Sequence, residues 1–129
     1  MNNYTVVVVD DHTLLSQAIE AMVNTFEQFK VLYTCKNGKE LTEHFTEDAS
    51  KVPNIVLMDI NMPKINGFET SKIIRSNEVT TPIIAVTAFD RQEIEEKMID
   101  AGINDVIVKP FEPAKLFQMI FKLINEKSL

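Results

Sequence analysis

The stretch Ile55–Asp59 constrains the fold more than any other part of the chain. Four consecutive apolar residues end in a carboxylate, with Pro53 and Asn54 before them and a proline-containing turn after them. An apolar run of this length between turn signals predicts a strand buried on both faces, as in the middle of a parallel sheet. Asp59 would then lie at the carboxyl edge, where open α/β sheets bind their ligands. Taken alone, one such acid is more often a loop residue or a helix N-cap.

Four further apolar runs predict the other strands, over residues 5–9, 31–35, 82–87 and 105–108. Apolar residues at helical spacing, with turn and cap signals, predict helices over about 12–25, 39–48, 67–76, 90–101 and 113–125. Five strands alternating with five helices predict an α/β fold with a doubly wound, five-stranded parallel sheet in the flavodoxin-like order 2-1-3-4-5. The length favours one domain over residues 1–129.

Composition excludes several classes of function. The net charge of −6 does not favour nucleic acid as a partner. No apolar run approaches the roughly 18 residues that a membrane span needs. The single Cys35 excludes an internal disulfide, fits a reducing cytoplasm and is expected to be a buried small hydrophobe.

Polar residues follow four of the predicted strands where each one ends. They are the pair Asp10-Asp11, then Asp59, Thr87 and Lys109. The predicted strand order places these four strands side by side, so all of these side chains should surround one crevice.

This set of groups indicates phosphoryl chemistry that depends on a metal ion. Clustered carboxylates need a counter-charge, and oxygen ligands with no histidine or cysteine expected nearby suit the small, hard Mg²⁺. Lys109 and Thr87 would contact the phosphoryl oxygens. Asp59, on the central strand, is the candidate nucleophile, and Asp10 and Asp11 would hold the metal.

The sequence resembles the response-regulator receiver domains of two-component signalling, which have a CheY-like fold. The resemblance covers residues from about 4 to 124. It is carried by Val8–His12, by Met58–Pro63 with Gly67, by Pro82–Ala88, and by Ala101-Gly102 leading to Asp105 and Lys109–Phe111.

The resemblance implies that Asp59 accepts a phosphoryl group from a histidine kinase or a histidine phosphotransfer protein. The chain would catalyse its own phosphorylation rather than act as an enzyme on a separate substrate. Asp11, Asp59 and the backbone carbonyl of Asn61 would ligate Mg²⁺ directly, and Asp10 largely through water. Ala88 would leave room for the phosphoryl group, and the Lys109-Pro110 bond is expected to be cis.

One position departs from the family pattern. Receivers usually carry Tyr or Phe in the last strand, and the ring moves inward as the threonine hydroxyl turns to the phosphate. Val106 stands there and has no ring. We therefore expect a readout other than the usual coupling between threonine and aromatic ring.

Two other functions compete with this interpretation. A haloacid-dehalogenase-type phosphatase would use the same groups but needs a second acid two residues after the nucleophile, where this chain has Asn61. A pseudo-receiver, a binding module that takes up no phosphate, would normally lack one of the acids, the threonine or the lysine. None is missing here.

The wider role of the domain has two sequence-based interpretations. The start at Met1 and the end soon after the last helix fit a single-domain regulator. The run Lys109–Pro113 before an apolar helix is instead typical of a hybrid histidine kinase receiver, which we slightly favour. His12 could be a ligand or a phosphoryl donor, but we expect an exposed residue at the rim of the site, where the kinase could touch it.

The last predicted helix carries more apolar surface than one core face needs. Phe117 and Phe121 widen its apolar arc, so the rings are either covered by neighbouring elements or exposed as a contact surface. Receivers often dimerise through the fourth helix, fifth strand and fifth helix, so a homodimer through that face is a further expectation.

Overall fold

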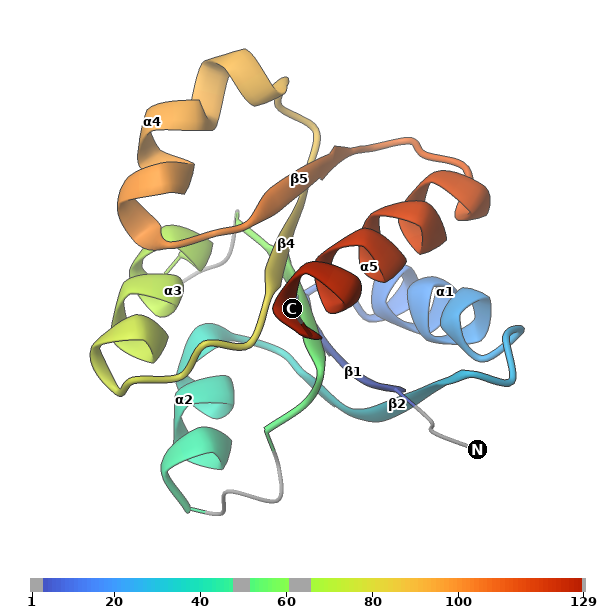
Figure 1. The fold of residues 1–129 in the computed structure, drawn as a ribbon, viewed down its shortest axis with the longest axis horizontal. Helices are drawn as coiled ribbons and strands as arrows, with labels where there is room; N and C mark the ends of the chain where they lie inside the picture. The colour runs from blue at the N-terminus through green and yellow to red at the C-terminus, as the bar shows by residue number, and fades with distance from the viewer. Residues whose placement is uncertain (1–3, 48–51, 61–65, 129) are drawn as a thin grey trace.

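A computed structural model describes residues 4–47, 52–60 and 66–128, and in these ranges strands alternate with helices (Figure 1). The strands are β1 (Tyr4–Val9), β2 (Phe29–Cys35), β3 (Ile55–Asp59), β4 (Ile83–Thr87) and β5 (Asp105–Val108). The helices are α1 (Thr13–Val23), α2 (Gly38–Glu47), α3 (Gly67–Ser76), α4 (Arg91–Ala101) and α5 (Pro113–Ser128). The predicted elements are confirmed, with ends that differ by a few residues.

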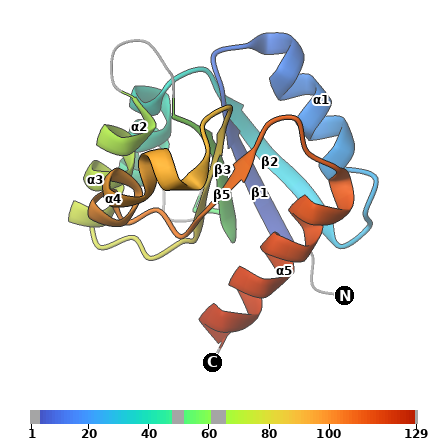
Figure 2. The same cartoon turned by 90° about the horizontal axis from the view of Figure 1, so that it is seen from above.

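The five strands form one parallel sheet in the order β2-β1-β3-β4-β5, as predicted. Helices α1 and α5 cover one face of this sheet, and α2, α3 and α4 cover the other (Figures 1 and 2). Every residue of β3 is buried, because helices lie on both sides of this central strand. This explains why its sequence is a continuous apolar run rather than an alternating one.

Two apolar cores lie on the two faces of the sheet. Along each strand successive side chains point to opposite faces, so Val7 and Val56 join the core under α2, α3 and α4. Val8 and Leu57 join the core under α1 and α5. Burial of each large aliphatic side chain stabilises the fold by about 1.5–3 kcal/mol.

Specific residues lie at the first or last positions of the helices that flank the site. Asn66 caps α3 by accepting a hydrogen bond from the backbone N–H of Glu69 at 2.9 Å. Gly102 ends α4 with a φ of 79°, the left-handed conformation in which glycine commonly ends a helix. His12 takes the N-cap position of α1, yet its side chain makes no capping hydrogen bond.

The aromatic side chains of α5 are mostly covered. Phe117 is only 3% exposed, and its ring centroid lies 3.9 Å from that of Phe26 and 5.5 Å from that of Phe29. Phe121 is half-buried, 5.2 Å from Phe29. The interpretation of Phe117 as an exposed contact residue is therefore wrong. The cover comes from β2 and from the turn between α1 and β2, which helical spacing within α5 could not reveal.

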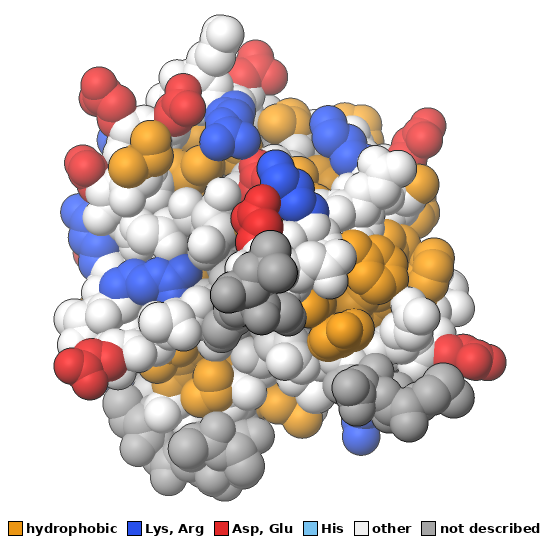
Figure 3. All heavy atoms as spheres, viewed as in Figure 1, with side chains coloured by type: hydrophobic (Ala, Val, Ile, Leu, Met, Phe, Trp, Pro, Cys, Tyr) orange, Lys and Arg blue, Asp and Glu red, His pale blue; other side chains and the backbone are white. Residues whose placement is uncertain are grey.

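Some apolar side chains nevertheless remain at the surface. Leu14 shares the helical spacing of the apolar positions in α1 but is 83% exposed, and Phe26 is 41% exposed. Apolar side chains also gather on the side of the molecule where α5 and α1 lie (Figure 3). Among the described residues, no helix is both long and apolar enough to cross a membrane.

Candidate functional site

The strand register brings the predicted site residues to one edge of the sheet. Val9 pairs with Met58, so Asp10 and Asp59 follow at adjacent positions of β1 and β3. Asp59 in turn pairs with Val86, one residue before Thr87 on β4. Thr87 pairs with Val108, which precedes Lys109. The predicted meeting of these strand ends is confirmed.

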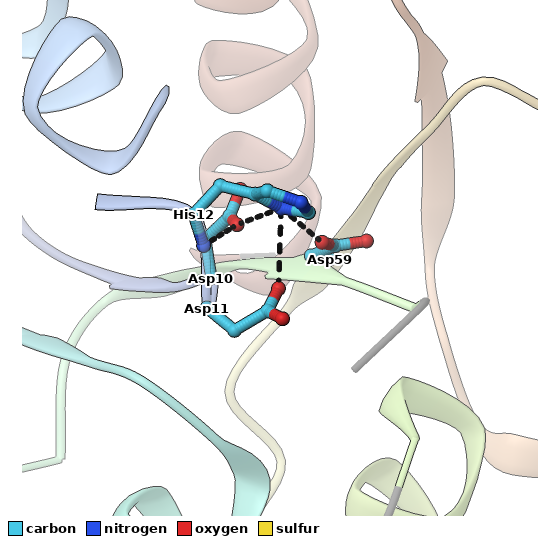
Figure 4. Close-up of polar contacts among 4 residues, drawn as sticks. All are labelled: Asp10, Asp11, His12 and Asp59. Atoms are coloured by element: carbon cyan, nitrogen blue, oxygen red, sulfur yellow. Dashed lines mark hydrogen bonds and ion pairs between the residues drawn. The ribbon is translucent and has the colours of Figure 1, made fainter. Parts of the chain in front are cut away.

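Three carboxylates and one imidazole form a compact cluster at this edge (Figure 4). One ligand atom from each of Asp10, Asp11, His12 and Asp59 lies within 4.8 Å of the others. The His12 Nδ1 atom is 3.2 Å from Asp10 Oδ1, 3.2 Å from Asp11 Oδ1 and 3.8 Å from Asp59 Oδ2. A single ring nitrogen therefore faces all three acids.

The buried acids of the cluster lie in an electrostatically costly environment. Asp10 and Asp59 are 4% and 3% exposed, whereas the Asp11 side chain keeps 30% of its surface. Asp10 Oδ1 accepts a hydrogen bond from the backbone N–H of His12 at 2.8 Å. Asp10 Oδ2 is buried with no hydrogen-bond partner among the described residues. Because a buried carboxylate oxygen is costly without a partner, this atom fits a cation ligand.

Oxygen ligands from three acids fit a hard divalent cation such as Mg²⁺. The residues present therefore suit the metal that the sequence analysis expects. Asn61, whose carbonyl completes the expected ligand set, lies outside the described residues.

Thr87 contributes a buried hydroxyl that is engaged by the following turn. The residue is 1% exposed, and its Oγ1 accepts a hydrogen bond from the backbone N–H of Phe89 at 3.1 Å. Ala88, between them, is exposed. Any rotation of the Thr87 side chain must therefore release the Phe89 N–H.

Lys109 follows β5 and is anchored by its backbone to the threonine. Its N–H donates to the Thr87 carbonyl oxygen at 2.7 Å, and the Lys109-Pro110 bond is cis, as expected. The residue also lines an apolar pocket of about 420 Å³ beside α1, with Leu15, Met22 and Phe111. The His12 imidazole lies within ion-pair distance of all three clustered acids.

Glycine allows α3 to begin close to the end of β3. A Cβ atom on Gly67 would lie 2.7 Å from the Ile60 Cα and 2.9 Å from the Asp59 carbonyl oxygen. The Gly67 N–H also donates to the Ile60 carbonyl oxygen at 3.2 Å. Any larger residue at 67 would push the helix away from the strand that carries Asp59.

Val106 lies in the core under α2, α3 and α4, 6% exposed, and pairs with Ala85. This apolar strand position has no ring to couple to Thr87. Phe89, two residues after Thr87, is 42% exposed and lines a pocket of about 510 Å³ with Phe68 and Ile94.

The sequence alone predicts His12 at the rim of the site and not in the cluster. The imidazole is indeed 66% exposed, but its Nδ1 atom points inward at the acids. The only signal in the sequence was its place directly after Asp10-Asp11. That adjacency could not show which way the ring turns.

Residues 6–121 match the sequence profile of the family described as the response regulator receiver domain. The chemotaxis protein CheY of Thermotoga maritima is 32% identical over 118 residues, which cover 92% of this chain and 95% of that protein. The two-component response regulator ARR22 of Arabidopsis thaliana is 35% identical over 122 residues, covering 93% of this chain and 83% of that one. The match to the transcriptional regulatory protein CitT of Halalkalibacterium halodurans spans only 54% of that longer protein.

Solved structures show the same fold. The receiver domain of the sensor histidine kinase PA1611 from Pseudomonas aeruginosa superimposes with a TM-score of 0.82 at 27% identity, over 95% of this chain and 98% of that one. That structure has a magnesium ion coordinated in its active site cleft. The response regulator domain of Thermotoga maritima CheB has a TM-score of 0.84 at 26% identity, over 96% and 98% of the two chains.

Proposed function

Because the chain belongs to the family of response regulator receiver domains, we propose that Asp59 is the residue that takes up the phosphoryl group. The donor would be a phosphohistidine on a histidine kinase or on a histidine phosphotransfer protein. One observation carries the assignment to Asp59. It ends the central strand, is buried, and lies within 4.8 Å of the ligand atoms of Asp10 and Asp11.

The transfer needs one nucleophilic oxygen on Asp59. A carboxylate oxygen attacks phosphorus, a new P–O bond forms, and the P–N bond to the donor imidazole breaks. The imidazole leaves with the electron pair of that bond and takes a proton from water. The product is an aspartyl phosphate at Asp59.

Asp11 and Asp59 would hold Mg²⁺ directly, and Asp10 would contribute largely through bound water. When bound, Mg²⁺ supplies positive charge that neutralises the phosphoryl oxygens as they approach the acids. The buried, unpartnered Oδ2 of Asp10 supports this ligand set, because a metal or its bound water would satisfy it. The backbone carbonyl of Asn61 would complete the ligand set.

Thr87 and Lys109 would contact the transferred group. The Thr87 hydroxyl can turn from the Phe89 N–H toward the phosphoryl oxygens, and the long side chain of Lys109 can bring an ammonium to them. Ala88, between Thr87 and Phe89, carries only a methyl group and would leave room for the phosphoryl group, as the family pattern requires. Rotation of Thr87 would also release the turn at Phe89, which offers a readout that does not need a ring at Val106.

The experiment that tests this assignment is intact-mass measurement after treatment with acetyl phosphate and Mg²⁺. The wild type should gain the mass of one phosphoryl group, and Asp59→Asn should gain none because the amide is a poor nucleophile. Asp100→Asn, which removes an exposed acid on α4, is the matched control and should be phosphorylated as the wild type is. Phosphorylation of Asp59→Asn at the wild-type level would disprove the assignment. No uptake by the wild type, with beryllofluoride also failing to bind, would indicate a pseudo-receiver.

We also propose that the domain acts in the cytoplasm and signals through protein contacts. An exposed apolar residue supports a homodimer through α4, β5 and α5, since Ile99 on α4 is 64% exposed. Sedimentation of the beryllofluoride-treated protein tests this surface. Ile99→Glu should remove association and leave phosphorylation intact. Unchanged association in that variant would exclude the surface.

A further inference from the structure

We propose that His12 is a metal ligand through Nδ1, and that it gives the acid cluster a preference for nitrogen-binding divalent transition metals of the Co²⁺ and Zn²⁺ class. The inference rests on the proposed function only in taking the acid cluster as the metal site. It adds a nitrogen donor to a ligand set that was expected to consist of oxygen atoms alone.

The direction of the ring is the first observation. His12 stands at the N-cap of α1 but makes no capping hydrogen bond with its side chain. Its Nδ1 instead lies 3.2 Å from an oxygen of Asp10 and 3.2 Å from an oxygen of Asp11. In Figure 4 the ring extends over the acids, with Nδ1 on the side that faces them. This direction brings a ring nitrogen to within 4.8 Å of the oxygen atoms that the three acids offer.

The buried oxygen of Asp10 is an independent observation. The Asp10 side chain is only 2% exposed, and its Oδ2 has no hydrogen-bond partner among the described residues. His12 satisfies only the other oxygen, Oδ1. The cluster therefore still offers a desolvated acceptor that a cation would satisfy.

The size of the cluster fits one ion. Ligands on opposite sides of an octahedral ion are about 4.2 Å apart at bond lengths of about 2.1 Å. The four ligand atoms of the cluster already lie within 4.8 Å of one another, so a small contraction is sufficient. The neutral imidazole with its proton on Nε2 leaves the Nδ1 lone pair for the metal. Since the ring is 66% exposed, water can accept the hydrogen bond from Nε2.

The chemistry of the donors predicts the selectivity. Carboxylate and carbonyl oxygens suit Mg²⁺, whereas imidazole favours Zn²⁺, Ni²⁺ and related ions. Adding Nδ1 to the acids should raise the affinity for Co²⁺ and Zn²⁺ while changing the affinity for Mg²⁺ little. A ring that acted only as a hydrogen-bond donor to the acids would compete with every cation equally.

Calorimetric titration of the metal-free protein with Zn²⁺, Co²⁺ and Mg²⁺ separates these two roles. In His12→Ala the affinity for Zn²⁺ and Co²⁺ should fall about tenfold or more, with the Mg²⁺ affinity equal to or slightly above that of the wild type. His44→Ala is the matched control. It removes the other histidine, which packs against Tyr33 with tilted rings whose centroids lie 4.3 Å apart, and it should keep wild-type selectivity.

Proton NMR of the Co²⁺-loaded protein gives a direct readout of ligation. The wild type and His44→Ala should show strongly shifted signals from the non-exchangeable ring protons of a ligating imidazole, and His12→Ala should lack them. Equal ratios of Zn²⁺ to Mg²⁺ affinity in wild type and His12→Ala, or an unshifted spectrum, would overturn the proposal while leaving Asp59 phosphorylation untouched. Failure of the wild type to bind any of the three ions would instead overturn the metal site of the proposed function, and this inference with it.

Discussion

The two edges of the sheet differ in how completely their polar side chains are hydrogen-bonded. At the amino edge, Arg75 uses all five of its N–H donors: two reach the Gly102 carbonyl, and the others reach the Val79 and Thr81 carbonyls and Asn104 Oδ1, at 2.8–3.0 Å. At the carboxyl edge, three acids face one imidazole, and a buried oxygen of Asp10 has no partner in the described chain.

This difference separates structure from function. A polar network in which every donor is satisfied holds elements together, and here it joins the end of α3 to the loops before β4 and β5. A cluster with unbalanced charge costs stability and is useful only if something binds there. Burial lowers the pKa of Arg75, and because all five of its donors already have acceptors, the guanidinium has no N–H left for a ligand.

The aromatic cluster at the amino edge should give the largest effect. Phe117→Ala removes a ring that is 3% exposed and packs on Phe26 and Phe29, and we expect it to cost about 3–5 kcal/mol of unfolding free energy. Urea denaturation measures this cost. Phe121→Ala, at a half-buried position, should cost clearly less. Equal costs in the two variants would mean that the cluster does not hold this edge together.

Metal should stabilise the fold through the acid cluster, whereas the Arg75 network should not respond to metal. Binding of Mg²⁺ to the native state alone should stabilise the wild type by about 2.7 kcal/mol at a hundred times its dissociation constant. Asp11→Ala should relieve repulsion among the acids, stabilise the metal-free protein and lose the response to Mg²⁺. Thermal melts with and without Mg²⁺ test this, and a wild-type shift in the variant would remove Asp11 from the ligand set.

Loss of the Arg75 network should cost about 2 kcal/mol, because hydrogen bonds from a charged donor contribute about 1.5–3 kcal/mol. Arg75→Ala leaves its carbonyl acceptors without the guanidinium, while uptake of phosphate at the far edge should not change. Arg91→Ala is a sharp comparison, since it removes a half-exposed ion pair of 3.0 Å with Asp105 and should cost under about 1 kcal/mol. Similar denaturation midpoints for both variants would show that the Arg75 network stabilises the fold no more than the ion pair of Arg91 does.

Cys35 tests the carboxyl edge next to the site, where its carbonyl oxygen accepts a hydrogen bond from the Asp10 N–H at 2.9 Å, and should give the smallest effect. Burial, with a lesser contribution from Glu40, raises the pKa of this thiol to about 12. The native protein should therefore resist thiol reagents at pH 8, whereas the urea-unfolded protein should react fully. Because the raised pKa favours the neutral thiol, this contribution to stability is complete below about pH 8.5 and declines as the pH rises toward 12. Rapid native labelling would show that β2 opens readily.

The local sequence determined the elements and where the strands end. Runs such as Val6–Val9 and Ile55–Met58 can bury both faces only inside a parallel sheet, and period and turn signals then set the helices between them. The predicted strand order was then enough to place Asp10, Asp59 and Thr87 near one another, because parallel strands end at a common edge of the sheet.

The tertiary structure decided the features that depend on direction and on distant neighbours. Helical spacing placed Phe117 on a wide apolar arc but did not show whether it was buried. It is covered by Phe26, from the turn between α1 and β2, and by Phe29, from β2. Arg75 reads as an ordinary helix-end cation until the loops before β4 and β5 bring it five acceptor contacts. His12 follows the acids in sequence, yet its ring could have faced water. Side-chain direction is set by long-range packing and charge, which no local pattern contains.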